Sequence, residues 1–111
     1  MKKASFEDWK KLEIKVGKII QVDRVPDADK LYKILVDIGE EEPRQIVSGI
    51  VPYYKEDELV GKLICVITNL ESAKFRGVES NGMLLAASNN DDSQVILLSP
   101  EKAIDPGAII T

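Results

Sequence analysis

The sequence contains no histidine and only one cysteine, and these two shortages narrow the chemistry that the chain can perform. Histidine is the commonest general base, the usual partner of a serine or cysteine nucleophile, and a ligand in most zinc sites. The lone Cys65 has no partner for a disulfide within the chain and stands in an apolar run, which favours a buried, unreactive thiol. We therefore expect no catalytic activity from this chain alone, and neither a metal ion nor a cofactor.

Long apolar runs are also missing. No apolar stretch approaches the roughly 20 residues of a membrane-spanning helix, and the start MKKASFEDW lacks the apolar segment of a secretion signal. We expect a cytoplasmic protein that does not contact membranes. With 111 residues, of which 44% are hydrophobic, the chain has the size and composition of one folded domain.

Basic residues are outnumbered, with 15 Lys and Arg against 19 Asp and Glu. The acidic clusters at residues 40–42, 56–58 and 91–92 lack the spacing of a calcium loop, so we interpret them as solvated surface. A local basic pair in such a chain is difficult to explain as general solubilising charge. It indicates a site for an anion.

Lys74 and Arg76 form this basic pair, next to the glycine at residue 77. If residues 74–76 are extended, both cations leave the strand on one face and Phe75 points to the core on the other. The triplet would then be anchored by its aromatic ring while it presents two donors to an anion, and phosphate suits this geometry.

Alternating apolar residues predict strands along most of the chain. The expected strands are 12–22, with Gly17 supplying a bend or bulge, then 31–38, 44–48, 62–68 and a last one near 82–87. Two short helices are expected between them. One is capped by Ser5 with Phe6 and Trp9 on its inner face, and the other runs from Pro52 to Leu59.

Three strands, a helix and further strands fit a five-stranded oligonucleotide-binding barrel, although composition alone leaves other small barrels open. We expect a helical segment at 1–11, the barrel at 12–88 and a C-terminal extension at 89–111. The extension contains two apolar runs, at 95–98 and 108–110. Free tails are seldom this apolar, so we expect the extension to pack on the barrel and to form the interface of a homodimer.

Three separated motifs give a more specific indication: PDADKLY at 26–32, PRQIVSGI at 43–50 and AKFRGVESNGMLLAA at 73–87. Together they resemble the tRNA-binding domain family, over residues 12 to 111. That family supplies an appended domain or small (beta) subunit of many methionyl-tRNA synthetases, free-standing structure-specific tRNA-binding proteins and a small export-related chaperone. The resemblance implies an all-β fold, a five-stranded OB-fold Greek-key barrel with short helices and a C-terminal extension.

The residue pattern and the resemblance together give eight candidate RNA-binding residues: Lys30, Arg44, Ser48, Asn69, Lys74, Arg76, Ser80 and Met83. Structural alternatives stay open for several of them. Lys30 can belong to a polar turn, and Arg44 can pair with the acidic turn at 40–42. Asn69 can simply end a strand, while Ser80 and Met83 can be a turn hydroxyl and a core thioether.

Aromatic residues make up only 5% of the chain, too few for a platform that stacks successive bases. The RNA would therefore be recognised by its shape, through phosphates and riboses of a folded tRNA. The resemblance implies a non-catalytic accessory domain or subunit that helps the catalytic body of methionyl-tRNA synthetase to capture tRNA. The alternative is a dimeric, peptide-binding, export-type chaperone on the same fold.

Overall fold

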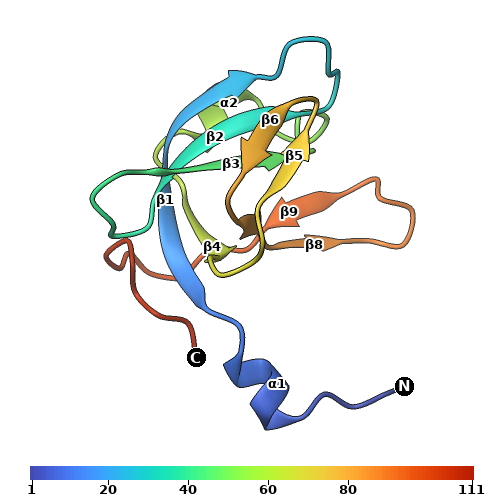
Figure 1. The fold of residues 1–111 in the computed structure, drawn as a ribbon. Helices are drawn as coiled ribbons and strands as arrows, with labels where there is room; N and C mark the ends of the chain where they lie inside the picture. Colours follow the sequence, from blue (N-terminus) through green and yellow to red (C-terminus); the bar gives the residue numbers. More distant parts are fainter.

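Strands and turns account for most of the chain in the computed structural model, which describes all residues 1–111 (Figure 1). The strands are β1 (Ile14–Arg24), β2 (Tyr32–Asp37), β3 (Arg44–Ser48), β4 (Leu63–Ile67), β5 (Ala73–Phe75), β6 (Val78–Ser80), β7 (Met83–Leu84), β8 (Ala86–Ser88) and β9 (Val95–Leu97). The helices are α1 (Phe6–Lys10) and α2 (Glu56–Leu59). The predicted all-β barrel of the oligonucleotide-binding type is confirmed.

Five strands form one antiparallel sheet in the order β3-β2-β1-β4-β7. β1 lies at its centre, because its first half pairs with β4 and its second half with β2. The pairing with β2 shifts between Ile19 and Gln21, so the bulge falls there and not at Gly17 as predicted. Gly17 instead permits close packing, since a Cβ there would lie 2.5 Å from Cγ1 of Val36.

The barrel closes where β3 meets the segment that joins β6 to β7. The amide of Asn81 donates to the carbonyl of Gln45 at 2.8 Å, and the Gln45 side chain donates to the carbonyl of Glu79 at 2.8 Å. The amide of Val47 donates to the hydroxyl of Ser80 at 2.9 Å. Aliphatic residues of the main strands, α2 and β9 fill the core: Ile19, Ile34, Ile46, Leu59, Ile64, Val66 and Leu97.

The C-terminal residues lie along β1. The amide of Val16 donates to the carbonyl of Ala108, and the amide of Ile110 donates to the carbonyl of Ile14. Part of this apolar segment is nevertheless left uncovered, since Ile109 is 69% exposed and Leu98 43% exposed.

Helix α1 begins where the sequence predicted, because the Ser5 hydroxyl accepts a hydrogen bond from the amide of Asp8 at 3.1 Å. The face of α1 that was predicted to point inward is not buried, since Phe6 is 70% and Trp9 43% exposed. Figure 1 shows α1 standing away from the barrel. None of the helices has the length and apolar character needed to cross a membrane.

The second helix is shorter than predicted. Residues 51–53 form a turn, in which the amide of Tyr53 donates to the carbonyl of Ile50, and α2 begins only at Glu56. The side chain of Glu58 accepts from the amide of Lys55 at 2.8 Å, which fixes the start of the helix after the turn. Pro52 therefore belongs to the turn and not to the first helical residues.

Candidate nucleic-acid interface

The loop between β1 and β2 and the β5–β6 hairpin meet over the outer face of β3. A small cluster apart from the main core joins them, in which Val25, Ala28 and Val47 are buried and Leu31 and Val78 pack against them. We call this cluster the satellite core. Loop tips usually move because they bury little, so this cluster gives the loop and the hairpin a fixed relative position.

The hairpin turns at Arg76 and Gly77, whose φ angles are 52° and 80°. Two adjacent residues with positive φ are typical of a tight type I′ hairpin turn. The predicted extended triplet 74–76 is therefore wrong, and Lys74 pairs across the hairpin with Glu79. Phe75 pairs with Val78 and is 44% exposed, so it does not anchor in the core.

Arg76 instead faces the β1–β2 loop, with which it lines a cavity of about 260 Å³. The lining residues are Ala28, Asp29, Lys30, Leu31 and Arg76. We call it the basic cavity. Lys30 and Arg76 are exposed, and neither is among the four salt bridges of the protein, whose cations are Lys10, Lys11, Lys15 and Arg44. Two unpaired cations beside one hollow suit an anion of the size of a phosphate group.

The backbone around the basic cavity is held in place. The guanidinium of Arg24 donates to the carbonyl of Asp29 at 3.1 Å, and the carbonyl of Lys30 accepts from the amide of Val51 at 3.3 Å. Arg76, in the lining of the cavity, has a positive φ, and so does Asp27, with a φ of 62°, which precedes the lining residue Ala28. Such strained conformations concentrate at functional sites, where the surrounding structure enforces them.

Ser48 lies on the same side of the molecule as Lys30. It ends β3, pairs with Tyr32 at the start of β2 and is half-buried. The next residue, Gly49, runs close beneath the loop, since a Cβ there would lie 3.9 Å from the carbonyl oxygen of Lys30. Lys30, Ser48 and Arg76 thus form the group of predicted residues that the fold brings together.

Arg44 lies at the opposite end of β3 and is engaged inside the protein. Its Nε and Nη2 atoms each donate to the Glu40 carboxylate at 3.0 Å. Its Nη1 atom donates to the carbonyls of Thr68 and Asn81. These bonds use four of the five guanidinium donors. The hydrogen bond from Arg44 also lowers the pKa of Glu40. Of the two alternatives for Arg44, the structure therefore shows the ion pair with the acidic turn at residues 40–42.

Asn69 and Ser80 also use their polar groups inside the protein. The Asn69 side chain accepts from the amide of Glu13 at 2.8 Å and donates to the carbonyl of Lys11 at 2.6 Å, so it ties the segment that follows α1 to the barrel. Ser80 is only 4% exposed, and besides accepting from β3 it donates to the carbonyl of Gly82 at 3.2 Å. Ser80 is therefore buried away from solvent, whereas Asn69 stays exposed with its side-chain amide engaged in internal hydrogen bonds, so its predicted contact with RNA stays a prediction.

Met83 is 46% exposed on β7, so the alternative that placed it in the core is wrong. Sequence reasoning overlooked Arg24, which shapes the basic cavity by holding the loop backbone. A basic residue at the end of a strand, six positions before Lys30, is the only signal that could have indicated it.

The chain is similar to proteins of known sequence and known structure. A family model described as "Putative tRNA binding domain" matches residues 14–109. The methionine–tRNA ligase of Archaeoglobus fulgidus is 50% identical over 103 residues, which make up 93% of this chain but 15% of that protein. The chain thus spans about one seventh of the length of the ligases that it matches.

Solved structures match over the whole chain. A MetRS-related protein from Pyrococcus horikoshii is 34% identical, with a TM-score of 0.92 and full coverage of both chains. The CsaA chaperone protein from Picrophilus torridus is 29% identical, with a TM-score of 0.87, over 98% of this chain and 100% of that one. The same fold therefore occurs in a MetRS-related protein and in a chaperone protein. The fold does not distinguish between the two, so the side chains of the site have to.

Proposed function

Because the chain belongs to the tRNA-binding domain family, we propose that it binds folded tRNA through the basic cavity between Lys30 and Arg76. The convergence of these two unpaired cations on one rigid hollow carries the proposal. Lys74 in the same hairpin as Arg76, and Ser48 at the end of β3, would add contacts to the RNA backbone. Asp29 also lines the cavity, and the net charge of the chain is −4, so the attraction is local and the affinity modest.

We further propose that the chain acts as an accessory domain or subunit of a methionyl-tRNA synthetase in the cytoplasm. It supplies tRNA binding and no catalysis of its own, and the ligases that it resembles are about seven times longer. Linking a weak tRNA site to a catalytic body raises the local concentration of tRNA there. Catalysis of methionylation would belong entirely to the partner.

The affinity for tRNA should depend on salt, because phosphate contacts release bound counterions. With about three to four phosphates neutralised, a plot of log affinity against log salt should have a slope of roughly −2 to −3. Titrations with total tRNA at several potassium chloride concentrations measure this slope. A slope near zero, or equal affinity for an unstructured single strand, would contradict shape-based binding.

We also propose a homodimer. Four large apolar side chains are exposed: Phe6, Trp9, Leu98 and Ile109. Their uncovered apolar area suits a two-fold interface, which would bury these side chains in both subunits. Light scattering at micromolar concentration should give twice the chain mass for the parent and the monomer mass for Phe6→Ser/Trp9→Ser. Ile20→Ser, at another exposed apolar position, is the control and should stay dimeric. A monomeric parent refutes the proposal.

A peptide-binding chaperone is the second candidate, because the CsaA protein of Picrophilus torridus shares the fold over nearly the whole chain. The basic cavity weighs against it, since unpaired lysine and arginine gain little from an apolar peptide. Competition decides between the two functions. Unfolded peptide should leave bound tRNA in place, whereas a chaperone site that also accounts for RNA binding would release it.

A further inference from the structure

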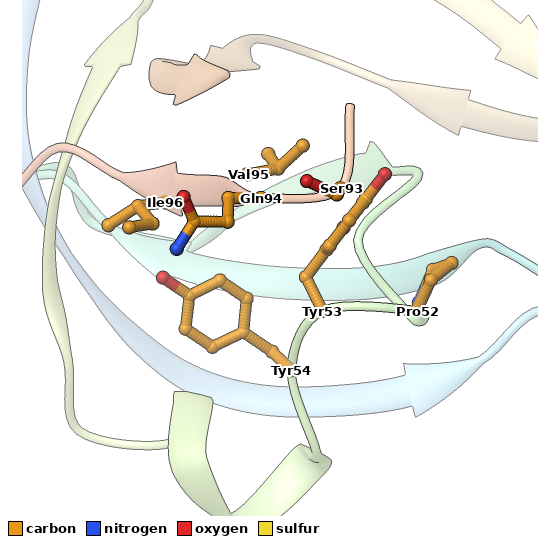
Figure 2. Close-up of a pocket in the computed structure, with 7 residues that line it drawn as sticks. All are labelled: Pro52, Tyr53, Tyr54, Ser93, Gln94, Val95 and Ile96. Atoms are coloured by element: carbon orange, nitrogen blue, oxygen red, sulfur yellow. The ribbon is translucent and has the colours of Figure 1, made fainter. Parts of the chain in front are cut away.

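A second cavity, of about 430 Å³, lies between residues 52–54 and the β8–β9 hairpin (Figure 2). The side chains of Tyr53, Tyr54, Gln94 and Ile96 form much of its lining. Its volume falls in the range of about 300–1,000 Å³ that is usual for small-molecule pockets. We call it the tyrosine cavity, and the tRNA-binding surface described above does not include it.

Both tyrosine rings are fixed by their hydroxyl groups. Tyr53 donates to the carbonyl of Asp92 at 2.8 Å, and the Tyr54 hydroxyl accepts from the amide of Leu97 at 3.1 Å. The hydroxyls are therefore used for holding the hairpin to the barrel. Figure 2 shows the Tyr54 ring face-on and the Tyr53 ring edge-on, so their planes meet at a steep angle beside the open space. Fixed aromatic walls suit a flat partner, because stacking then costs no ordering of the rings.

Gln94 provides an unused polar group at the same place. Its backbone amide donates to the side chain of Asn89 and its carbonyl accepts from the amide of Asn89, while its side-chain amide has no partner in the protein. Figure 2 shows that side chain beside Tyr54, at the edge of the cavity. A free amide offers one acceptor and two donors side by side, a pattern that pairs with the edge of a nucleobase.

The charges around the tyrosine cavity are unequally distributed. The ammonium of Lys62 lies 5.8 Å from the centre of the Tyr54 ring, and it makes no salt bridge with a carboxylate. The acidic residue Asp92 lies at the other end, where its backbone carbonyl accepts from the Tyr53 hydroxyl. An anionic group should therefore be attracted to the Tyr54 end and repelled from the Tyr53 end.

The two cavities are neighbours along the chain surface. The amide of Val51 donates to the carbonyl of Lys30 in the wall of the basic cavity, and the next residues, Pro52 and Tyr53, line the tyrosine cavity. The stretch of backbone that joins the two cavities is therefore only a few residues long.

We propose that the tyrosine cavity holds one unstacked nucleotide of the bound RNA. Its base lies against the tyrosine rings with an edge on the Gln94 amide, and its phosphate is directed to Lys62. This inference rests on the proposed tRNA binding and adds to it a contact with a base. The aliphatic side chain of a peptide is the less suitable occupant, since it would leave both the amide and the ammonium without a partner.

The test combines mononucleotide titration with tRNA binding by matched variants. In NMR spectra, nucleoside monophosphates at millimolar concentration should shift the signals of Tyr53, Tyr54 and the Gln94 side-chain amide. Gln94→Leu should abolish the shifts and weaken tRNA binding at least about five-fold. Gln21→Leu, the same change at an exposed position of β1, should bind tRNA as the parent does. Lys62→Ala should weaken monophosphate binding without affecting nucleosides.

The outcomes separate the two proposals. If no mononucleotide shifts these signals and Gln94→Leu binds tRNA like the parent, the tyrosine cavity is not an RNA contact, while the basic cavity stands. Shifts caused only by an apolar peptide overturn the inference in favour of a peptide site. If the parent does not bind tRNA at all, both proposals fail. Gln94→Ala repeats the test should the leucine variant not fold.

Discussion

Alanine at both Lys30 and Arg76 should lower the affinity for tRNA by about 2 to 4 kcal/mol, from two lost charge-assisted contacts. Both side chains are exposed and free of internal salt bridges, so their removal should leave the melting temperature nearly unchanged. Fluorescence anisotropy with labelled tRNA and thermal unfolding by circular dichroism measure the two quantities. The expected result is a large loss of binding in a protein that is folded as before.

Lys18→Ala/Lys102→Ala is the matched control, because it removes the same net charge at two other exposed positions. Its effect should be limited to the general field of the protein, which salt largely screens at these separations. Lys74→Ala should have a smaller effect than either cavity residue, since Lys74 stands opposite Glu79 in the hairpin. If the control weakens binding as much as the double variant does, the basic cavity is not the site.

The main barrel was predictable because its strands are half-buried and their apolar residues alternate. Residues 44–48 were predicted as a strand, and β3 has these bounds. The other strands agree within a few residues, except near 82–87, where the chain forms two short strands, β7 and β8. There the backbone leaves β4 to pair with β9, and the sequence contains no local signal for a change of partner.

The site was harder to predict because side-chain partners come from distant parts of the chain. Arg44 and Lys30 are both cations next to conspicuous motif residues, yet only Arg44 meets the carbonyls of Thr68 and Asn81. Closure of the barrel brings those acceptors near Arg44. The residue pattern of a single strand carries no information about this closure. The sequence therefore indicated which basic residues to consider but could not show that Arg44 is engaged inside the protein while Lys30 is exposed without a salt bridge.

The hairpin turn was a missed local signal. A two-residue turn between Ala73–Phe75 and Val78–Ser80 favours a glycine, and Gly77 is present in it. An extended Lys74–Arg76 segment leaves no room for such a turn. A turn at residues 76 and 77 directs Arg76 away from the Lys74 strand and toward the β1–β2 loop, where the structure places it.

Replacement of Arg44 by alanine should mainly reduce stability, by about 2 to 3 kcal/mol in the free energy of unfolding, because it breaks bonds to a carboxylate and to two backbone carbonyls. Those carbonyls belong to the segments that close the barrel, so they lose a partner in a partly buried place. Urea unfolding at neutral pH measures the loss. Affinity for tRNA, measured at a temperature where the variant is folded, should change far less than in the Lys30/Arg76 double variant.

The acid dependence of stability gives this prediction a second readout. Hydrogen bonding from Arg44 lowers the pKa of Glu40 in the folded protein, so its contribution to stability is complete above the pKa of the unfolded chain. That contribution disappears as the pH falls through the lowered pKa of the folded state. The gap in unfolding free energy between the parent and Arg44→Ala should therefore narrow in acid. A variant as stable as the parent but deficient in tRNA binding would instead return Arg44 to the RNA-binding face.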